Sequence, residues 1–159
     1  MSSSARDVWG QTINGKPHVG ATARRSRRTS MKDIELFSEI SGDFNPLHYD
    51  EALAEASVFG KLIVQGGVIS GILNALVAEE LPGPGTVFLD VSWRFVKAVG
   101  VGEEIVGEVE VLSVRDDKPI VKLKTRVANA DGEDCLVGEA TVYVAALRHL
   151  SQARRIAVA

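Results

Sequence analysis

Residues 67–85 read GVISGILNALVAEELPGPG, and the periodicity of this stretch decides the fold class. Apolar pairs recur every four residues, and the positions between them are mostly small. The pairs are Val68-Ile69, Ile72-Leu73 and Leu76-Val77. This spacing predicts a helix from Gly67 that is apolar on most sides and therefore buried. The prolines and glycines of residues 81–85 end it, because proline lacks the N–H donor and glycine favours a break.

The residues after this helix change to the pattern of β-strands. Four segments rich in Val, Ile and Thr are separated by turns that contain Gly, Asp or Pro, which predicts consecutive antiparallel strands. They span 86–96, 103–114, 120–128 and 136–146. In the first segment the odd-numbered residues from Val87 to Phe95 are all apolar, so we expect one apolar face that a helix must cover. Together these elements predict an α+β domain whose antiparallel sheet is wrapped around one long central helix.

The residues before the buried helix predict two short helices and an edge strand. Ser30 and Asp33 have the spacing of a helix N-cap, and apolar residues then recur at helical spacing as far as Ile40. A second short helix is predicted over Asp50–Ala56, with Asp50 as its cap. The run RRSRR at 24–28 suits a charged edge strand better than a nucleic-acid patch, because no second basic cluster accompanies it.

Length and composition indicate one folded unit. The chain has 159 residues, which we divide into a flexible N-terminal extension (1–18), a folded domain (19–148) and a C-terminal tail (149–159). Its formal charge of −3 gives no reason to expect a nucleic-acid partner. Cys135 is the only cysteine, and no Cys/His cluster has metal-site spacing. We therefore expect no metal. No signal peptide or membrane-spanning segment is evident, so we expect a cytoplasmic protein with no membrane partner.

The segment SGDFNPLH at 41–48 is the strongest chemical signal in the chain. It places a carboxylate, Asp43, and an imidazole, His48, five residues apart across an Asn-Pro turn. Pro46 restricts the loop, so both groups could be preorganised in one pocket for proton transfer. Spacing alone leaves an even alternative, in which Asp43 and Asn45 make side-chain turns and His48 is satisfied by a neighbour.

The same segment matches the G-D-x-N-P-x-H signature, and the chain resembles the MaoC-like (R)-specific enoyl-CoA hydratases. The resemblance extends over roughly residues 19–146. It is carried also by Leu81-Pro82-Gly83, Ser92-Trp93-Arg94-Phe95, Val101-Gly102-Glu103 and Asp117-Lys118-Pro119-Ile120. It implies a hot-dog fold, a homodimer, and reversible hydration of trans-2-enoyl-CoA to (R)-3-hydroxyacyl-CoA. The acyl-CoA thioester would bring its own CoA, so no separate cofactor is expected.

The resemblance implies that Asp43 and His48 jointly hold the water, with Asp43 as base and His48 as proton donor, although the assignment of the two protons stays open. General acid–base help of this kind is worth about 10²–10⁴-fold in rate. An oxyanion hole is expected from a backbone N–H at the start of the buried helix, and Gly66 is the candidate. Because the motif lies on a loop, substituting either residue of the pair should cost little stability.

Substrate contacts are expected at five further positions: Asn45, Gln65, Gly67, Asn74 and Val77. The family has His-Gly-Met or His-Gly-Leu where this chain has Gln65-Gly66-Gly67, so substrate placement there departs from the family pattern. Asn74 and Val77 match positions that line the family's acyl pocket. An unpaired Asn74 would disfavour a long apolar tail by about 1–3 kcal/mol, which favours short acyl chains.

Three other functions are compatible with the same fold. A hot-dog thioesterase would use its carboxylate to activate water against the carbonyl carbon, and the Asp-x-Asn-Pro-x-His arrangement argues against it. A 3-hydroxyacyl-ACP or specialised acyl-CoA dehydratase would perform the same chemistry on another carrier or acyl group. A non-catalytic acyl-thioester binding module would not need both Asp43 and His48.

Overall fold

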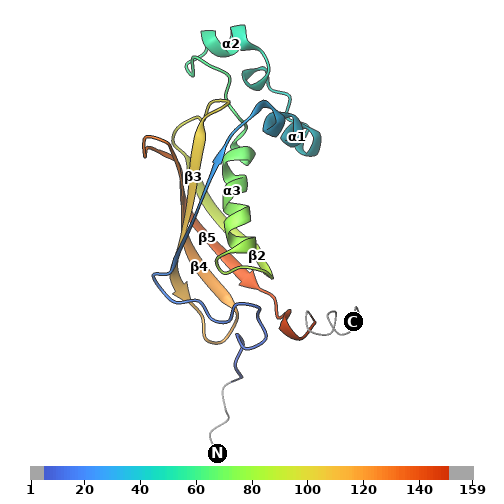
Figure 1. The fold of residues 1–159 in the computed structure, drawn as a ribbon, viewed down its shortest axis with the longest axis vertical. Helices are drawn as coiled ribbons and strands as arrows, with labels where there is room; N and C mark the ends of the chain where they lie inside the picture. Colours follow the sequence, from blue (N-terminus) through green and yellow to red (C-terminus); the bar gives the residue numbers. More distant parts are fainter. Residues whose placement is uncertain (1–5, 151–159) are drawn as a thin grey trace, which may run out of the picture.

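The computed structural model describes residues 6–150 as one antiparallel sheet with a long helix along its concave side (Figure 1). The strands are ordered β1-β3-β4-β5-β2, and every neighbouring pair is antiparallel. In chain order the elements are β1 (Thr22–Arg28), α1 (Met31–Ser41), the 3-10 helix η1 (Pro46–His48), α2 (Glu51–Ala56), α3 (Gly66–Glu79), β2 (Thr86–Phe95), β3 (Glu104–Val114), β4 (Ile120–Asn129) and β5 (Asp134–Val144). The predicted α+β class is confirmed.

Helix α3 forms the centre of the core, as its periodicity predicts. All six residues of the three apolar pairs are buried, and they pack against inward-facing residues of β3, β4 and β5. A Cβ at Gly107 of β3 would lie 2.8 Å from Ile72, so a glycine there lets the sheet approach the helix closely. Within residues 6–150, no helix is long and apolar enough to cross a membrane.

The two short helices and the charged strand form where the sequence predicts them. Ser30 caps α1, and its backbone N–H donates to the Asp33 carboxylate at 2.8 Å. Asp50 caps α2 by accepting from Leu53 N at 3.1 Å. The arginines of β1 lie at one edge of the sheet and pair with carboxylates on neighbouring elements, including Arg24 with Glu108 at 3.5 Å. This edge is therefore charged along its length.

The expectation of one continuous apolar face on β2 is wrong, because a bulge interrupts the strand. The register with β5 shifts between Phe88 and Asp90. Phe88 pairs with the buried Val142, whereas Val87 pairs with the exposed Tyr143 and so points to the other face. The bulge adds one residue to the strand, and this reverses the alternation of side chains. Trp93 and Phe88 pack on the core, while the remaining apolar residues of β2 stay exposed: Val87, Leu89, Val91 and Phe95.

The expectation that residues 1–18 form a loose extension is wrong for the part around Trp9. Trp9 is 4% exposed, belongs to the core cluster, and donates from Nε1 to Arg115 O at 2.9 Å. Asn14 also donates to Pro82 O at 3.0 Å. Few apolar residues precede the domain, so periodicity gave no sign of this packing. Residues 1–5 and most of the expected tail, 151–159, lie outside the described residues.

Candidate active site

The loop between α1 and α2 is held by two successive side-chain turns. Gly42 ends α1 in the left-handed conformation, with φ 77°, and so redirects the chain at Asp43. Asp43 Oδ1 accepts from Asn45 N at 3.1 Å, and Asn45 Oδ1 accepts from Leu47 N at 3.1 Å. These turns occupy one oxygen of the Asp43 carboxylate and leave Oδ2 free.

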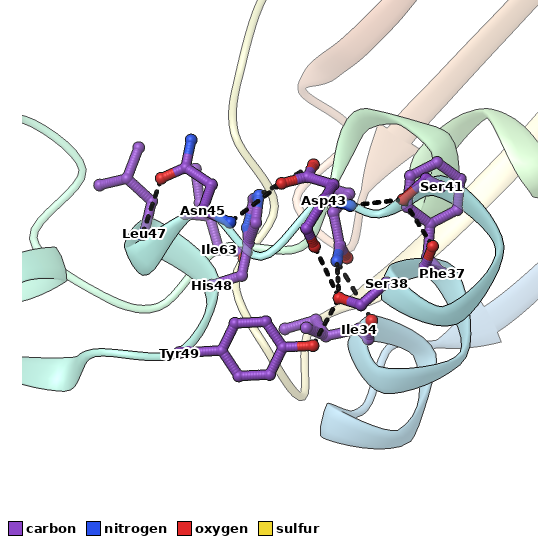
Figure 2. Close-up of polar contacts among 11 residues, drawn as sticks. Ile34, Phe37, Ser38, Ser41, Asp43, Asn45, Leu47, His48, Tyr49 and Ile63 are labelled. Carbon is purple, nitrogen blue, oxygen red and sulfur yellow. Dashed lines mark hydrogen bonds and ion pairs between the residues drawn. The ribbon is translucent and has the colours of Figure 1, made fainter.

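His48 is fixed from the opposite side of its ring. Its Nδ1 lies 2.6 Å from the carbonyl oxygen of Ile63. A carbonyl can only accept, so Nδ1 carries the proton and Nε2 is the reactive nitrogen. Nε2 faces Asp43 Oδ2 at 3.6 Å (Figure 2). The structure thus brings together the two residues that the motif predicts as the catalytic pair.

The separation of Asp43 and His48 suits a bridged water better than a direct contact. A distance of 3.6 Å between Oδ2 and Nε2 is too long for a hydrogen bond, but one water can span it. The side chain of His48 is only 8% exposed, whereas that of Asp43 is 38% exposed. The pair therefore lies at the boundary between the protein interior and an open side from which a substrate can enter.

The first residue of α3 is Gly66, one residue earlier than the periodicity indicated. Helix N-terminal N–H groups have no acceptor within the helix, and they carry the positive end of its dipole. The carbonyl that orients His48 belongs to Ile63, three residues before Gly66. One short segment thus supports the imidazole and begins the helix whose free N–H groups could stabilise an oxyanion.

The other predicted substrate contacts lie in different surroundings. Gln65 is 2% exposed and its amide is turned toward α1, and Gly67 lies against the ring of Phe37. Asn74 is exposed on α3, about 12 Å along the helix axis from Gly66 at 1.5 Å per residue. Val77 is 1% exposed within the core. The structure therefore brings Asp43 and His48 together and links the start of α3 to their loop through Ile63 and Gln65, whereas Val77 is enclosed in the core.

Three residues of the site were missed by sequence reasoning. They are Ile63, through its carbonyl, and Ser38 and Tyr49, whose hydroxyl groups meet behind Asp43. A backbone carbonyl has no sequence signal of its own. Ser38 did have one, since it is a polar residue on the inward side of an otherwise amphipathic helix.

The fold and the site together define a hot-dog domain with an Asp/His pair beside the start of its central helix. A family model described as "MaoC like domain" matches residues 13–132, and the chain belongs to this family. An (R)-specific enoyl-CoA hydratase of Aeromonas caviae is 40% identical over 124 residues, which cover 78% of this chain and 92% of the relative.

Other comparisons give the same family. The solved structure of the (R)-hydratase from A. caviae superposes with a TM-score of 0.78 at 39% identity, covering 81% of this chain and 98% of that one. A 3-hydroxybutyryl-CoA dehydratase of Methylorubrum extorquens is 33% identical over 79% of this chain and 80% of its own length. A mitochondrial 3-hydroxyacyl-[acyl-carrier-protein] dehydratase of Arabidopsis thaliana is also 33% identical, over 79% of this chain and 76% of its own length.

Proposed function

We propose that this protein is a hydro-lyase that reversibly hydrates trans-2-enoyl-CoA to (R)-3-hydroxyacyl-CoA. The observation that carries the proposal is the pair of Asp43 Oδ2 and His48 Nε2, which face each other at 3.6 Å while their other polar atoms are held by the backbone. Two relatives named (R)-specific enoyl-CoA hydratase, at 40% and 34% identity, support the same activity.

The protons balance if the pair begins as carboxylate and imidazolium. A water bridging the two groups loses one proton to Asp43 Oδ2 as its oxygen bonds to C3 of the enoyl group. His48 Nε2 gives its proton to C2, and the π bond between C2 and C3 is lost. The proton on Asp43 then returns to His48 through the next water, which restores the starting state. The reaction uses no cofactor besides the CoA of the substrate.

The thioester oxygen gains negative charge as the water oxygen bonds to C3, and it loses that charge when C2 is protonated. We assign its stabilisation to the backbone N–H of Gly66, where the positive end of the α3 dipole adds to the hydrogen bond. The CoA-side carbonyl then lies at the start of α3 and the acyl tail runs along the helix. A tail that reaches Asn74 meets a polar amide, so we expect short acyl chains to be preferred.

We propose that two copies of the chain associate through β2. Both β1 and β2 are edges of the sheet, but β1 carries paired charges and β2 carries exposed apolar residues. Charged edges resist strand addition, whereas an apolar edge favours it. Phe95 of β2 also lies within 3.1 Å of where a Cβ of Gly66 would be, so this interface would border the site. We place the dimer in the cytoplasm, in keeping with the buried free thiol of Cys135.

The test is an absorbance assay of crotonyl-CoA with the purified protein, run beside Asp43→Asn and His48→Ala while free thiol is measured. We expect loss of the enoyl absorbance, an (R)-3-hydroxy product, and a fall of about 10²–10⁴-fold in each variant. Thiol release without hydration would instead identify a thioesterase. Variants as active as the parent protein would refute the assignment of the pair.

A dehydratase acting on acyl-carrier-protein thioesters is a second candidate, favoured by the relatives that are named for that reaction. The chemistry of the pair is the same, and only the carrier differs. Comparing kcat/KM for crotonyl-CoA and crotonyl-ACP distinguishes the two, because the preferred carrier should give the higher value.

A further inference from the structure

Behind the catalytic loop, the hydroxyl group of Ser38 joins three separate segments of the chain. Ser38 lies on α1, is 1% exposed, and donates to the backbone oxygen of Asp43 at 2.7 Å. It also contacts Tyr49 Oη at 2.5 Å (Figure 2). It accepts a further bond from Gln65 Nε2 at 3.2 Å. The Ser38 hydroxyl has one proton, and it donates this proton in the hydrogen bond to the Asp43 carbonyl oxygen. Tyr49 must therefore be the donor in its bond to Ser38.

Each partner of Ser38 is part of the reaction site or next to it. Asp43 is itself the carboxylate of the pair, Tyr49 directly follows His48, and Gln65 directly precedes Gly66. One buried side chain thus connects the positions of the base, the imidazole and the start of α3.

The side chain of Gln65 is directed toward α1 and is shielded from solvent. It is 2% exposed, and its Nε2 donates a second bond to the backbone oxygen of Ile34 at 3.1 Å. Both of these bonds attach the N-cap of α3 to α1. Its Oε1 has no partner among the described residues. Burying an amide with an unpaired oxygen is unfavourable. The two hydrogen bonds donated by Nε2 offset part of this cost.

A second contact between the same helices lies one residue beyond Gly66. A Cβ on Gly67 would be 2.1 Å from two ring carbons of Phe37, so the ring fills the space that any side chain at 67 would need. Phe37 and Ser38 are neighbours on α1, and Gln65 and Gly67 flank Gly66. The start of α3 is therefore held to α1 on both sides of the candidate oxyanion donor.

We propose that Ser38 and Gln65, together with the packing of Phe37 on Gly67, form a clamp that positions the Gly66 N–H relative to Asp43 and His48. The proposal rests on the proposed hydratase function and changes the expected role of residues 65 and 67 from substrate contacts to positioning. Ser38 and Gln65 touch no reacting atom in it. They act through the backbone of Asp43 and through the start of α3.

The first test compares Gln65→Met, Ser38→Ala and the double variant in the crotonyl-CoA assay. We expect kcat to fall by about 10²-fold in the single variants with KM nearly unchanged, because misplacement affects the transition state more than substrate binding. The double variant should lose less activity than the product of the two single losses, since both single variants remove the bond between Ser38 and Gln65. Gln65→His, which keeps an N–H donor, should recover most of the activity.

The second test uses Gly67→Ala, which must displace the Phe37 ring. We expect kcat to fall, and Phe37→Leu in the same chain to restore part of it. Gly71→Ala is the matched control one turn later on α3, where a Cβ would meet nothing within 4 Å, and its kcat should be unchanged. Val109→Ala, a core variant on β3, shows what lost stability alone does to kcat.

A kcat within twofold of the parent protein in Gln65→Met and Ser38→Ala would overturn the clamp. A raised KM at unchanged kcat would overturn it too, since Gln65 would then be a substrate contact. Amide hydrogen exchange separates this failure from failure of the proposed function, because it needs no turnover. Exchange over residues 42–49 should accelerate at least tenfold in Gln65→Met but not in Val109→Ala, and equal exchange in both would reject the clamp.

Discussion

His48 and Asp43 form the proposed catalytic pair but differ in how much of the fold depends on them. His48 is 6% exposed and bonded to Ile63 O, while the side chain of Asp43 is 38% exposed and its Oδ2 faces His48 Nε2. His48→Ala would leave the Ile63 carbonyl unpaired in the interior, whereas Asp43→Asn keeps the oxygen that accepts from Asn45. We therefore expect the loss of stability to be small for Asp43→Asn and larger for His48→Ala.

We predict that His48→Ala lowers the free energy of unfolding by about 1–3 kcal/mol, while Asp43→Asn changes it by less than about 0.5 kcal/mol. Both variants should lose turnover. Urea unfolding followed by fluorescence measures the difference. Equal midpoints for the two variants would show that the bond from His48 to Ile63 adds nothing to stability.

The thiol of Cys135 should be unreactive in the folded protein. Burial raises the pKa of its thiol, and the side chain is fully buried on β5. Because only the thiolate is nucleophilic, a raised pKa lowers reactivity in the native protein at any pH below it. Iodoacetamide at pH 8 should label Cys135 slowly in the folded protein and rapidly in urea. Rapid labelling without denaturant would mean that β5 opens readily.

Among the elements, β2 and β5 approach each other unusually closely. A Cβ on Gly138 would lie 1.9 Å from the backbone oxygen of Ser92, so only glycine permits this pairing. We predict that Gly138→Ala lowers the free energy of unfolding by about 1–3 kcal/mol or more. Gly71→Ala should raise it by up to about 1 kcal/mol, because alanine is the better helix former. Thermal unfolding compares the two, and an unchanged Gly138→Ala protein would contradict the close pairing.

At the level of the whole molecule, we expect an added charge to disturb assembly at one edge of the sheet but not at the other. Val91→Lys places a charge on the exposed apolar edge β2, and we expect it to convert the proposed dimer to a monomer. Thr22→Lys, on the charged edge β1, is the matched control and should leave the assembly unchanged. Light scattering after gel filtration reports the mass of each variant. A Val91→Lys protein that remains a dimer would exclude β2 as the interface.

The local pattern of the chain was sufficient for the elements and for the reactive pair. The apolar pairs of α3 could be recognised because a buried helix repeats every few residues, and the turn residues after it delimit the strands. The five-residue spacing of Asp43 and His48 left two interpretations open, and the match of the whole motif to the family signature favoured the catalytic one. Interactions between neighbours in sequence leave a signal in the sequence itself.

Contacts between distant residues were decided only by the tertiary structure. Nothing local indicates that Ile63 O orients His48, that Trp9 reaches Arg115, or that Gln65 bonds Ser38 across 27 positions. The bulge in β2 was also not predicted, because one extra residue reverses the faces of a strand without altering its composition. The sequence therefore determined the class of fold and indicated the candidate pair, Asp43 and His48. Long-range packing determined how that pair is oriented, because it joins groups that no period or motif connects.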